Sequence, residues 1–228
     1  FCQAGMIRRP LRIKSVGKLV EDAVKIYENT GYDEICLYSL ASSDYPYLAE
    51  LTEKLLEIFT PHSVGLSLPS LRINEQLKIL PKVMASVRKS GITLAPEVGT
   101  ERMQSVVNKP ISHKDMQTAV LDAYNEGWDS IKLYFMIGLP FQDKEDYIAI
   151  SDMMHQVSEI RKKTNKGTGW VTASVSNFVA KSHTPFQWAS MAKTDVLKEI
   201  QKKLRGALKS SKINISFHNP FGTVLEGL

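Results

Sequence analysis

The chain has 228 residues, of which 43% are hydrophobic and 23% charged, and its formal net charge at pH 7 is +5. These values are ordinary for a globular protein with one sizeable core, and no apolar run reaches the roughly 18 residues of a membrane span, so no membrane partner is expected. Two cysteines, Cys2 and Cys36, are too few for a secreted disulfide scaffold, which favours the cytoplasm.

The first third of the chain alternates between helical spacing of apolar residues and short apolar runs. Ser15 is typical of a helix N-cap, and Gly31 of a helix stop. Pro81 should delay a later helix because proline lacks an amide donor. The expected elements are a helix between Ser15 and Gly31, a strand at 34–40, a helix at about 47–59, a strand at 63–68 and a helix around 77–87.

The same alternation continues to the end of the chain. The expected elements are strands at 92–95, 131–137, 170–179 and 213–218, and helices at about 114–126, 144–161 and 194–210. The connections between strands are too long for hairpins, which predicts an α/β fold of parallel βαβ units, either a barrel-like or a doubly wound sheet. The chain has no GxGxxG after its first strand and no P-loop motif, which weakens the doubly wound, nucleotide-binding interpretation.

The run IKLYFMIGLP, residues 131–140, is the most informative of these strands. It carries apolar side chains on both alternating faces, with Tyr134 and Met136 on one of them, which predicts a strand buried on both sides of a parallel sheet. Gly138 and Pro140 should end the strand at its carboxyl end. Parallel α/β proteins bind their ligands at that end.

Polar residues gather at the predicted strand ends. Those residues are Ser42, Ser43 and Asp44 after the first strand, Ser70 and Arg72 after the second, Glu97 after the third, and Lys181 and His183 after the fifth. Asp44 could instead cap the next helix, and Lys109 could be an ordinary surface lysine. Glu97 should have a partner or a ligand, because a carboxylate at the end of a buried strand is costly alone.

These strand ends resemble those of the radical S-adenosylmethionine (SAM) enzymes. Phe1-Cys2 is similar to the end of the CxxxCxΦC motif, whose three cysteines bind a four-iron, four-sulfur (4Fe-4S) cluster. The segment Ser42-Ser43-Asp44 stands where the family holds the SAM amino group, although it has neither the Gly nor the Glu of the family. Glu97 and Lys109 resemble the polar and basic positions of the coproporphyrinogen dehydrogenase and methylthiotransferase branches, and residues 135–140, FMIGLP, resemble the segment beside the adenine.

The resemblance extends over nearly the whole chain to the radical-SAM core of an uncharacterised bacterial group. It is carried by the segments LPSLR, APEVGTERM, NKPIS, KLYFMIGLP and HTPFQW. In that group a cobalamin-binding-like domain precedes the core, and a domain related to tRNA modification follows it. The resemblance implies a partial (β/α)6 TIM-like barrel over residues 1–228. The first strand and two cluster cysteines should then lie upstream of Phe1, so we expect a fragment that is not competent alone.

The implied function is that of a cytoplasmic transferase that binds a 4Fe-4S cluster and SAM and generates a 5′-deoxyadenosyl radical. Cys2 would be the iron ligand, and Phe1, Gly138 and Leu139 would surround the adenine. Glu97 would lie near the ribose, and Lys109 at the SAM carboxylate. An electron donor such as flavodoxin or ferredoxin would be a partner.

Several alternatives stay open at this point. Cobalamin-assisted methyl transfer and methylthiolation of RNA or protein both fit the resemblance. A non-catalytic barrel that has lost its cluster could hold RNA with its basic helices. A Schiff-base lyase would need a lysine on an inward strand position, and the best candidate, Lys132, lies at the amino-terminal end of its strand.

Overall fold

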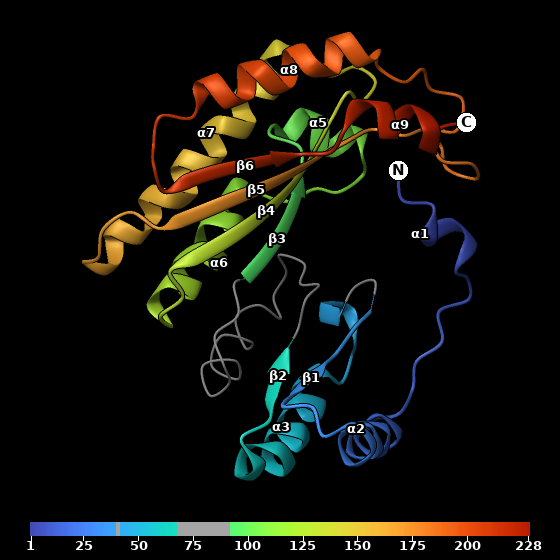
Figure 1. The fold of residues 1–228 in the computed structure, drawn as a ribbon, viewed down its shortest axis with the longest axis vertical. Helices are drawn as coiled ribbons and strands as arrows, with labels where there is room; N and C mark the ends of the chain where they lie inside the picture. Colours follow the sequence, from blue (N-terminus) through green and yellow to red (C-terminus); the bar gives the residue numbers. More distant parts are fainter. Residues whose placement is uncertain (40–41, 68–91) are drawn as a thin grey trace.

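Two parallel β-sheets organise the part of the chain described by this computed structural model, which comprises residues 1–39, 42–67 and 92–228 (Figure 1). One sheet pairs β1 with β2, and the other has the order β3-β4-β5-β6. The strands are β1 Glu34–Cys36, β2 Gly65–Ser67, β3 Ile92–Glu97, β4 Ser130–Ile137, β5 Trp170–Asn177 and β6 Ile213–Phe217. Pro81, Ser70 and Arg72 lie outside the described residues.

The helices alternate with these strands as predicted. They are α1 Ala4–Ile7, α2 Val16–Thr30, α3 Leu48–Phe59, α5 Glu101–Val106, α6 His113–Asn125, α7 Lys144–Ile160, α8 Thr194–Ala207 and α9 Pro220–Glu226, with 3-10 turns η1 Ser42–Asp44, η2 Thr60–His62 and η4 Arg161–Thr164. The predicted ends of α2 are confirmed, since the Ser15 side chain accepts a hydrogen bond from the Lys18 amide and Gly31 has a φ of 66°. In this part of the chain no helix is long and apolar enough to cross a membrane.

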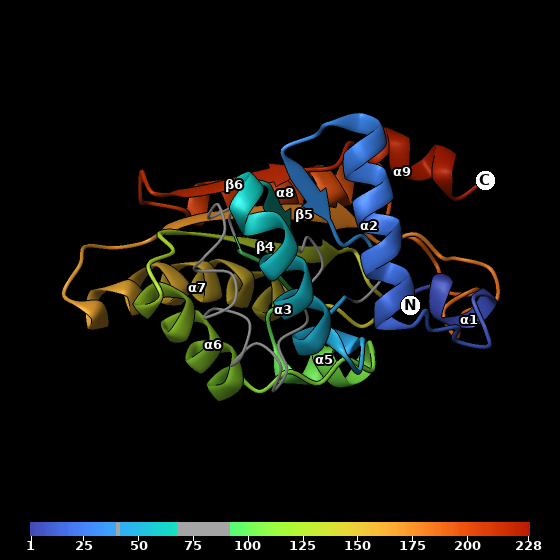
Figure 2. The same ribbon diagram turned by 90° about the horizontal axis from the view of Figure 1, so that it is seen from below.

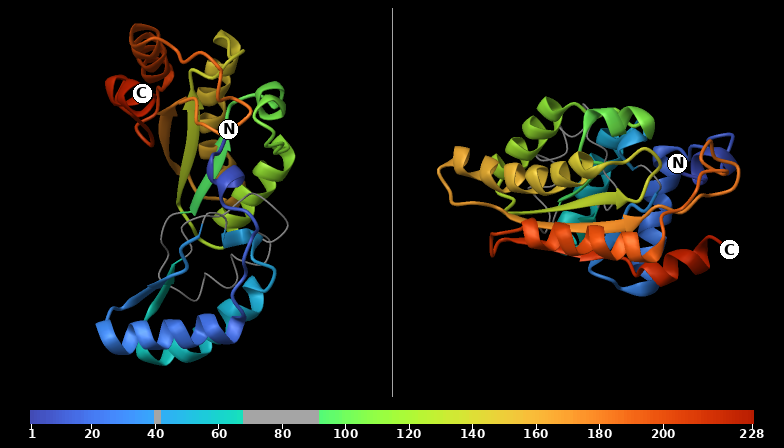
Figure 3. Two further views of the ribbon diagram at one scale, coloured as in Figure 1. Left: turned by 90° about the vertical axis from the view of Figure 1, so that its right-hand side faces the viewer. Right: turned by 90° about the horizontal axis from the view of Figure 1, so that it is seen from above.

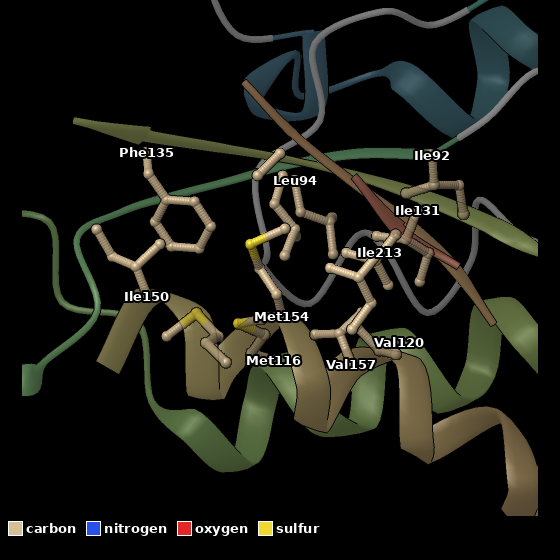
Figure 4. Close-up of a cluster of buried hydrophobic side chains, with 14 of the residues drawn as sticks. Ile92, Leu94, Met116, Val120, Ile131, Phe135, Ile150, Met154, Val157 and Ile213 are labelled. Carbon is tan, nitrogen blue, oxygen red and sulfur yellow. The ribbon is translucent and has the colours of Figure 1, made fainter. Parts of the chain in front are cut away.

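The four-stranded sheet packs one face against α6, α7 and α8. Leu133, Phe135 and Ile137 of β4 are at most 1% exposed, and they share a core with Val171 and Val175 of β5. Figure 4 shows Phe135 above Ile150 and Met154 of α7, with Met116 and Val120 of α6 beside them. The largest core of the described residues therefore lies between this sheet face and its helices.

The prediction that both faces of β4 are buried is wrong for the second face. Lys132 is exposed and Tyr134 is 38% exposed, whereas Met136 is buried. Helices α6, α7 and α8 all contribute to the core on the other face, so none of them covers these side chains. The residues beside them on β5, Thr172 and Ser174, are small and polar, and they do not enclose the tyrosine ring.

A smaller unit is formed by β1, β2, α2 and α3. Its core contains Ile35, Leu51, Leu55, Phe59 and Leu66, and it lies at one end of the molecule with the β3–β6 sheet at the other (Figures 1 and 3). From below, α2 and α3 lie across the view of the larger sheet (Figure 2). The predicted α/β fold with parallel strands is confirmed. It agrees with a partial TIM-like barrel, although the two sheets of the described residues do not join into a closed one.

Candidate functional site

A small apolar cluster lies where β3, β4 and β5 end. It consists of Val98, Met103, Val107, Met136, Leu139 and Phe178, with Phe1 packed against it. Phe178 also meets Phe186 edge to face, with ring centroids 5.7 Å apart. Phe1, the first residue, and Leu139, just after β4, thus pack in the same cluster at the carboxyl edge of the sheet.

Glu97 and Lys109 form an ion pair beside this cluster. Lys109 Nζ lies 2.8 Å from Glu97 Oε1, and the two side chains are only 24% and 18% exposed. Glu97 is the last residue of β3 and has a φ of 68°, which turns the chain out of the sheet at this point. The prediction that Glu97 needs a partner is therefore confirmed, and the partner is the lysine twelve residues later.

The segment between these two residues is folded back on itself. The Thr100 side chain caps α5 by accepting a hydrogen bond from the Met103 amide at 3.3 Å. After α5 the chain turns at Asn108, whose φ is 53°, and the Lys109 amide donates to the Gln104 carbonyl at 2.9 Å. These local bonds return Lys109 to the strand end that carries Glu97.

Four polar residues, which we call the exit clamp, tie the end of β3 to the end of β4: Thr100, Arg102, Asp143 and Asp146. The Thr100 hydroxyl donates to Asp146 Oδ1 at 2.5 Å. The Arg102 guanidinium donates to Asp143 Oδ2 at 3.1 Å and to Asp146 Oδ2. Asp146 is only 1% exposed. The clamp therefore fixes the two strand exits relative to each other.

The exit clamp also caps α7. The Asp143 side chain accepts from the Glu145 and Asp146 amides, and the Asp143 amide donates to Asp146 Oδ2 at 2.9 Å, which completes a capping box. Hydrogen bonds from the Asp146 and Glu145 amides, together with the positive charge of Arg102, hold the pKa of Asp143 below its ordinary value. Our sequence interpretation missed this clamp, although an acidic residue three positions after Asp143 is the local signal of such a box.

The turn after β4 has two distinct parts. Gly138 has a φ of 77°, and a Cβ atom there would lie 2.8 Å from Leu197 Cδ2 of α8, so its missing side chain allows close packing on α8. Gln142 holds the rest of the turn, since its Oε1 accepts from the Leu139 amide at 3.1 Å and its Nε2 donates to the Met136 carbonyl at 3.2 Å. Leu139 reaches the apolar cluster, whereas Gly138 faces the helix layer.

The predicted residues after β1 lie in the turn η1. Ser42 is 5% exposed, and its hydroxyl donates to the Leu37 carbonyl at 2.9 Å. Ser43 and Asp44 complete the turn. Tyr45 and Leu48, which follow it, pack against the core of the larger sheet. Ser42 is thus tied to its own strand end, next to the larger sheet.

Cys2 is exposed. The neighbouring Gln3 donates from Nε2 to Ser182 Oγ at 2.9 Å, which ties the N-terminal segment to the loop after β5. In residues 1–39, 42–67 and 92–228, no group of three His, Cys, Asp or Glu side chains could hold a metal ion. The site therefore combines one thiol, a mostly buried ion pair and an apolar surface, which suits a ligand with both polar and flat apolar parts.

Comparison with known proteins gives two matches. Residues 1–154 match the Radical SAM superfamily. Over 224 residues the chain is 28% identical to an uncharacterized protein of Methanocaldococcus jannaschii, and the aligned region covers 96% of this chain and 46% of that protein. The chain thus spans about half the length of the relative that it matches.

Proposed function

The chain belongs to the radical SAM superfamily, and from this premise we propose that the site at the ends of β3 and β4 binds SAM beside a 4Fe-4S cluster. Residues 1–228 would act as one core domain of an enzyme. When bound, the two groups supply the chemistry of the family, in which reductive cleavage of SAM provides a 5′-deoxyadenosyl radical.

The residues of the site match the parts of SAM. Lys109 offers three N–H donors to the methionine carboxylate, and Glu97 offers acceptor oxygens to the ribose hydroxyls. Phe1 and Leu139 offer apolar contacts to the adenine ring. The turn at Gly138 sets the position of Leu139. Because Glu97 and Lys109 pair with each other at 2.8 Å, neither charge is left uncompensated before SAM arrives.

Cys2 is the residue that we assign to the cluster. It is exposed and directly follows Phe1, which contacts the apolar cluster, so a thiolate here would lie next to the adenine side of the site. The described residues bring one thiol to this end of the sheet, and Ser42, Ser43 and Asp44 stay our candidates for the SAM amino group. Cys2→Ala in the full-length protein should lower the iron content.

The reaction that follows SAM cleavage is a further part of the proposal. Methyl or methylthio transfer to RNA or protein, in the cytoplasm and with flavodoxin or ferredoxin as electron donor, follows from the family resemblance, and a corrinoid bound to another domain would identify the methyl transfer. A cluster-free RNA-binding barrel is the less favoured alternative, because residues 1–154 match the family.

The observation that carries the proposal is the Glu97–Lys109 pair beside the apolar cluster. It is tested by equilibrium dialysis of SAM against the full-length protein, reconstituted anaerobically with iron and sulfide. Lys109→Met should weaken SAM binding by about tenfold or more, because it removes a charge-assisted hydrogen bond. Lys114→Met, at an exposed lysine of α6, is the matched control and should leave the affinity unchanged.

Lys109→Met also leaves the Glu97 carboxylate without its partner, so a loss of fold must be separated from a loss of binding. The double variant Glu97→Gln with Lys109→Met removes both charges and should keep the melting temperature close to that of the parent. It should still bind SAM weakly. An unchanged SAM affinity in both variants would contradict the proposed site.

A further inference from the structure

The face of the β3–β6 sheet opposite its helices is polar. Strand register places its side chains in rows across the sheet: Thr93, Lys132, Thr172 and Asn214 form the first row, Tyr134, Ser174 and Ser216 the second, and Met136 and Ser176 the third. Parallel strands are usually apolar on both faces, and the interior of a packed barrel is filled by branched apolar residues. This face is therefore built to meet water or a polar ligand.

The accessibility of these residues agrees with that conclusion. Lys132, Asn214 and Ser216 are exposed, Tyr134 is 38% exposed, and Thr172 is partly exposed. Helices α6 and α7 lie on the other face of the sheet (Figure 4). A ligand that enters at the carboxyl edge, where Glu97 and Leu139 lie, would contact the side chains of this face.

Lys132 provides a positive charge on this face. Its Nζ lies over the Tyr134 ring, 5.2 Å from the centroid. Tyr134 is two residues closer to the carboxyl edge, so the ammonium group leans toward the SAM site although its backbone lies near the amino end of β4. Among the described residues no carboxylate lies within ion-pairing distance of Lys132.

Residues with hydrogen-bond donors share the row of this charge. Thr93 and Thr172 flank Lys132 on the neighbouring strands, at a strand spacing of about 4.8 Å. Asn214, one strand further, accepts from the Ile215 amide through Oδ1 at 2.9 Å, which leaves its NH2 group to donate toward a ligand. Phosphate groups have three strong acceptor oxygens and are often bound by lysine.

We propose that Lys132, with Thr93 and Thr172, binds the phosphate group of a small phosphorylated substrate that lies along this sheet face. The inference rests on the proposed function, because it places the other end of the substrate at the SAM site. The backbone of Lys132 is three residues, or about 10 Å, from Phe135, which is in register with Glu97. Because the ammonium group leans toward that end, the phosphate and the reacting end would lie within this distance. This length fits a small phosphorylated molecule, which would then take the place of the RNA or protein that the family resemblance implies as the acceptor.

The test is lysine footprinting of the full-length protein with an amine-acetylating reagent, read by peptide mass spectrometry, with and without inorganic phosphate. Phosphate should slow acetylation of Lys132 by about tenfold at saturation, since it contacts the amine directly. Lys198 and Lys202, exposed on α8, are the internal controls and should react at unchanged rates. Acetate and chloride at the same ionic strength should protect Lys132 much less.

A conservative variant distinguishes the specific site from general charge screening. Thr172→Val keeps the side-chain shape and removes the hydroxyl, so it should weaken the protection by phosphate. Thr118→Val, on the exposed surface of α6, should not. Equal protection by acetate, equal protection of Lys198, or no effect of Thr172→Val would overturn the proposal. The measurement needs neither cluster nor SAM, so its failure would leave the SAM assignment standing, whereas a failure of the SAM assignment would appear in the dialysis experiment.

Discussion

The two sheets of this chain differ in how their strands and strand ends are held. The β3–β6 sheet has two strands of eight residues and a core that joins α6, α7 and α8, and its exits are linked by the exit clamp. The β1–β2 sheet has strands of three residues and its own core of eight buried residues. Ser42 holds the exit of β1 through a bond to the adjacent Leu37 carbonyl. Contacts between distant segments therefore join the strand exits of the larger sheet, whereas a local bond holds the exit of β1.

This difference suggests different roles for the two units in the proposed binding site. Phe1 and Leu139 meet from distant parts of the chain, and the exit clamp joins the strand ends beside the Glu97–Lys109 pair, so the geometry of the site is set once the larger core forms. Such preorganisation lowers the entropic cost of ordering a binding site. The Ser42 hydroxyl in η1, by contrast, is held by a bond within its own segment, although Tyr45 and Leu48 after the turn pack against the larger core.

The largest expected effect comes from truncating each core. Phe135→Ala should destabilise the larger sheet by about 3–5 kcal/mol, and Leu55→Ala should destabilise the smaller unit by about 2–5 kcal/mol, because both side chains are 1% exposed and leave cavities. Denaturant unfolding combined with hydrogen exchange measures both. Phe135→Ala should accelerate exchange throughout β3–β6, whereas Leu55→Ala should accelerate it in α2, α3, β1 and β2, which share its core.

Ile148→Ala is the control for this pair, since Ile148 is 47% exposed on α7 and its truncation should cost little. If Leu55→Ala accelerates exchange in β4 and β5 as much as in α2, the two sheets unfold as one unit. The two sheets would then differ in how their strand ends are held but not in when they unfold.

The fold was predictable where the residues of one segment mark the ends of its own helix or strand. Ser15 and Gly31 mark the ends of α2, and the abrupt stop at Gly138 marks the end of β4. A partner for Glu97 was predictable because a carboxylate at the end of a buried strand is costly alone. Strand β1 is shorter than predicted, ending at Cys36, since an apolar run does not say how far pairing extends.

Other features depended on contacts that no local pattern contains. Arg102 and Asp146 are far apart in sequence, so the exit clamp could be recognised only in the folded structure. Tyr134 was predicted to be buried because its neighbours are apolar, but burial depends on which element covers a face. The same limit applies to Lys132, whose direction follows from its contact with the Tyr134 ring.

A second expected effect concerns Tyr124 in the larger core. Its hydroxyl donates to the Val157 carbonyl at 3.2 Å, and burial raises the pKa of Tyr124 to about 12. Between pH 10 and 12 the folded state keeps a proton that the unfolded chain releases, so the free energy of unfolding falls as the pH rises through this window. The loss should be on the order of 2–3 kcal/mol, and full stability is present below pH 10.

Tyr124→Phe should remove most of this alkaline loss, as measured by urea unfolding at pH 9, 10, 11 and 12. Tyr45→Phe is the matched variant beside β1. Burial also raises the pKa of Tyr45. The Tyr45 hydroxyl donates a hydrogen bond to the Lys14 carbonyl in an exposed position. An equal alkaline loss in the parent and in Tyr124→Phe would contradict the assignment to Tyr124.

The smallest expected effects compare the exit of β3, held by Arg102, with the exit of β1, held by Ser42. Arg102→Met should cost about 1–2 kcal/mol, because Asp146 keeps the Thr100 hydroxyl and the Asp143 amide as donors and because the arginine is half exposed. Hydrogen exchange should then increase in α5 and at the start of α7, and SAM binding should weaken through a looser Glu97–Lys109 pair. Ser42→Ala should cost about 1 kcal/mol and increase exchange only around β1, since its bond to Leu37 is local. If Ser42→Ala loosened α5 as much as Arg102→Met does, the two exits would be coupled, and η1 would belong to the same preorganised site as Glu97.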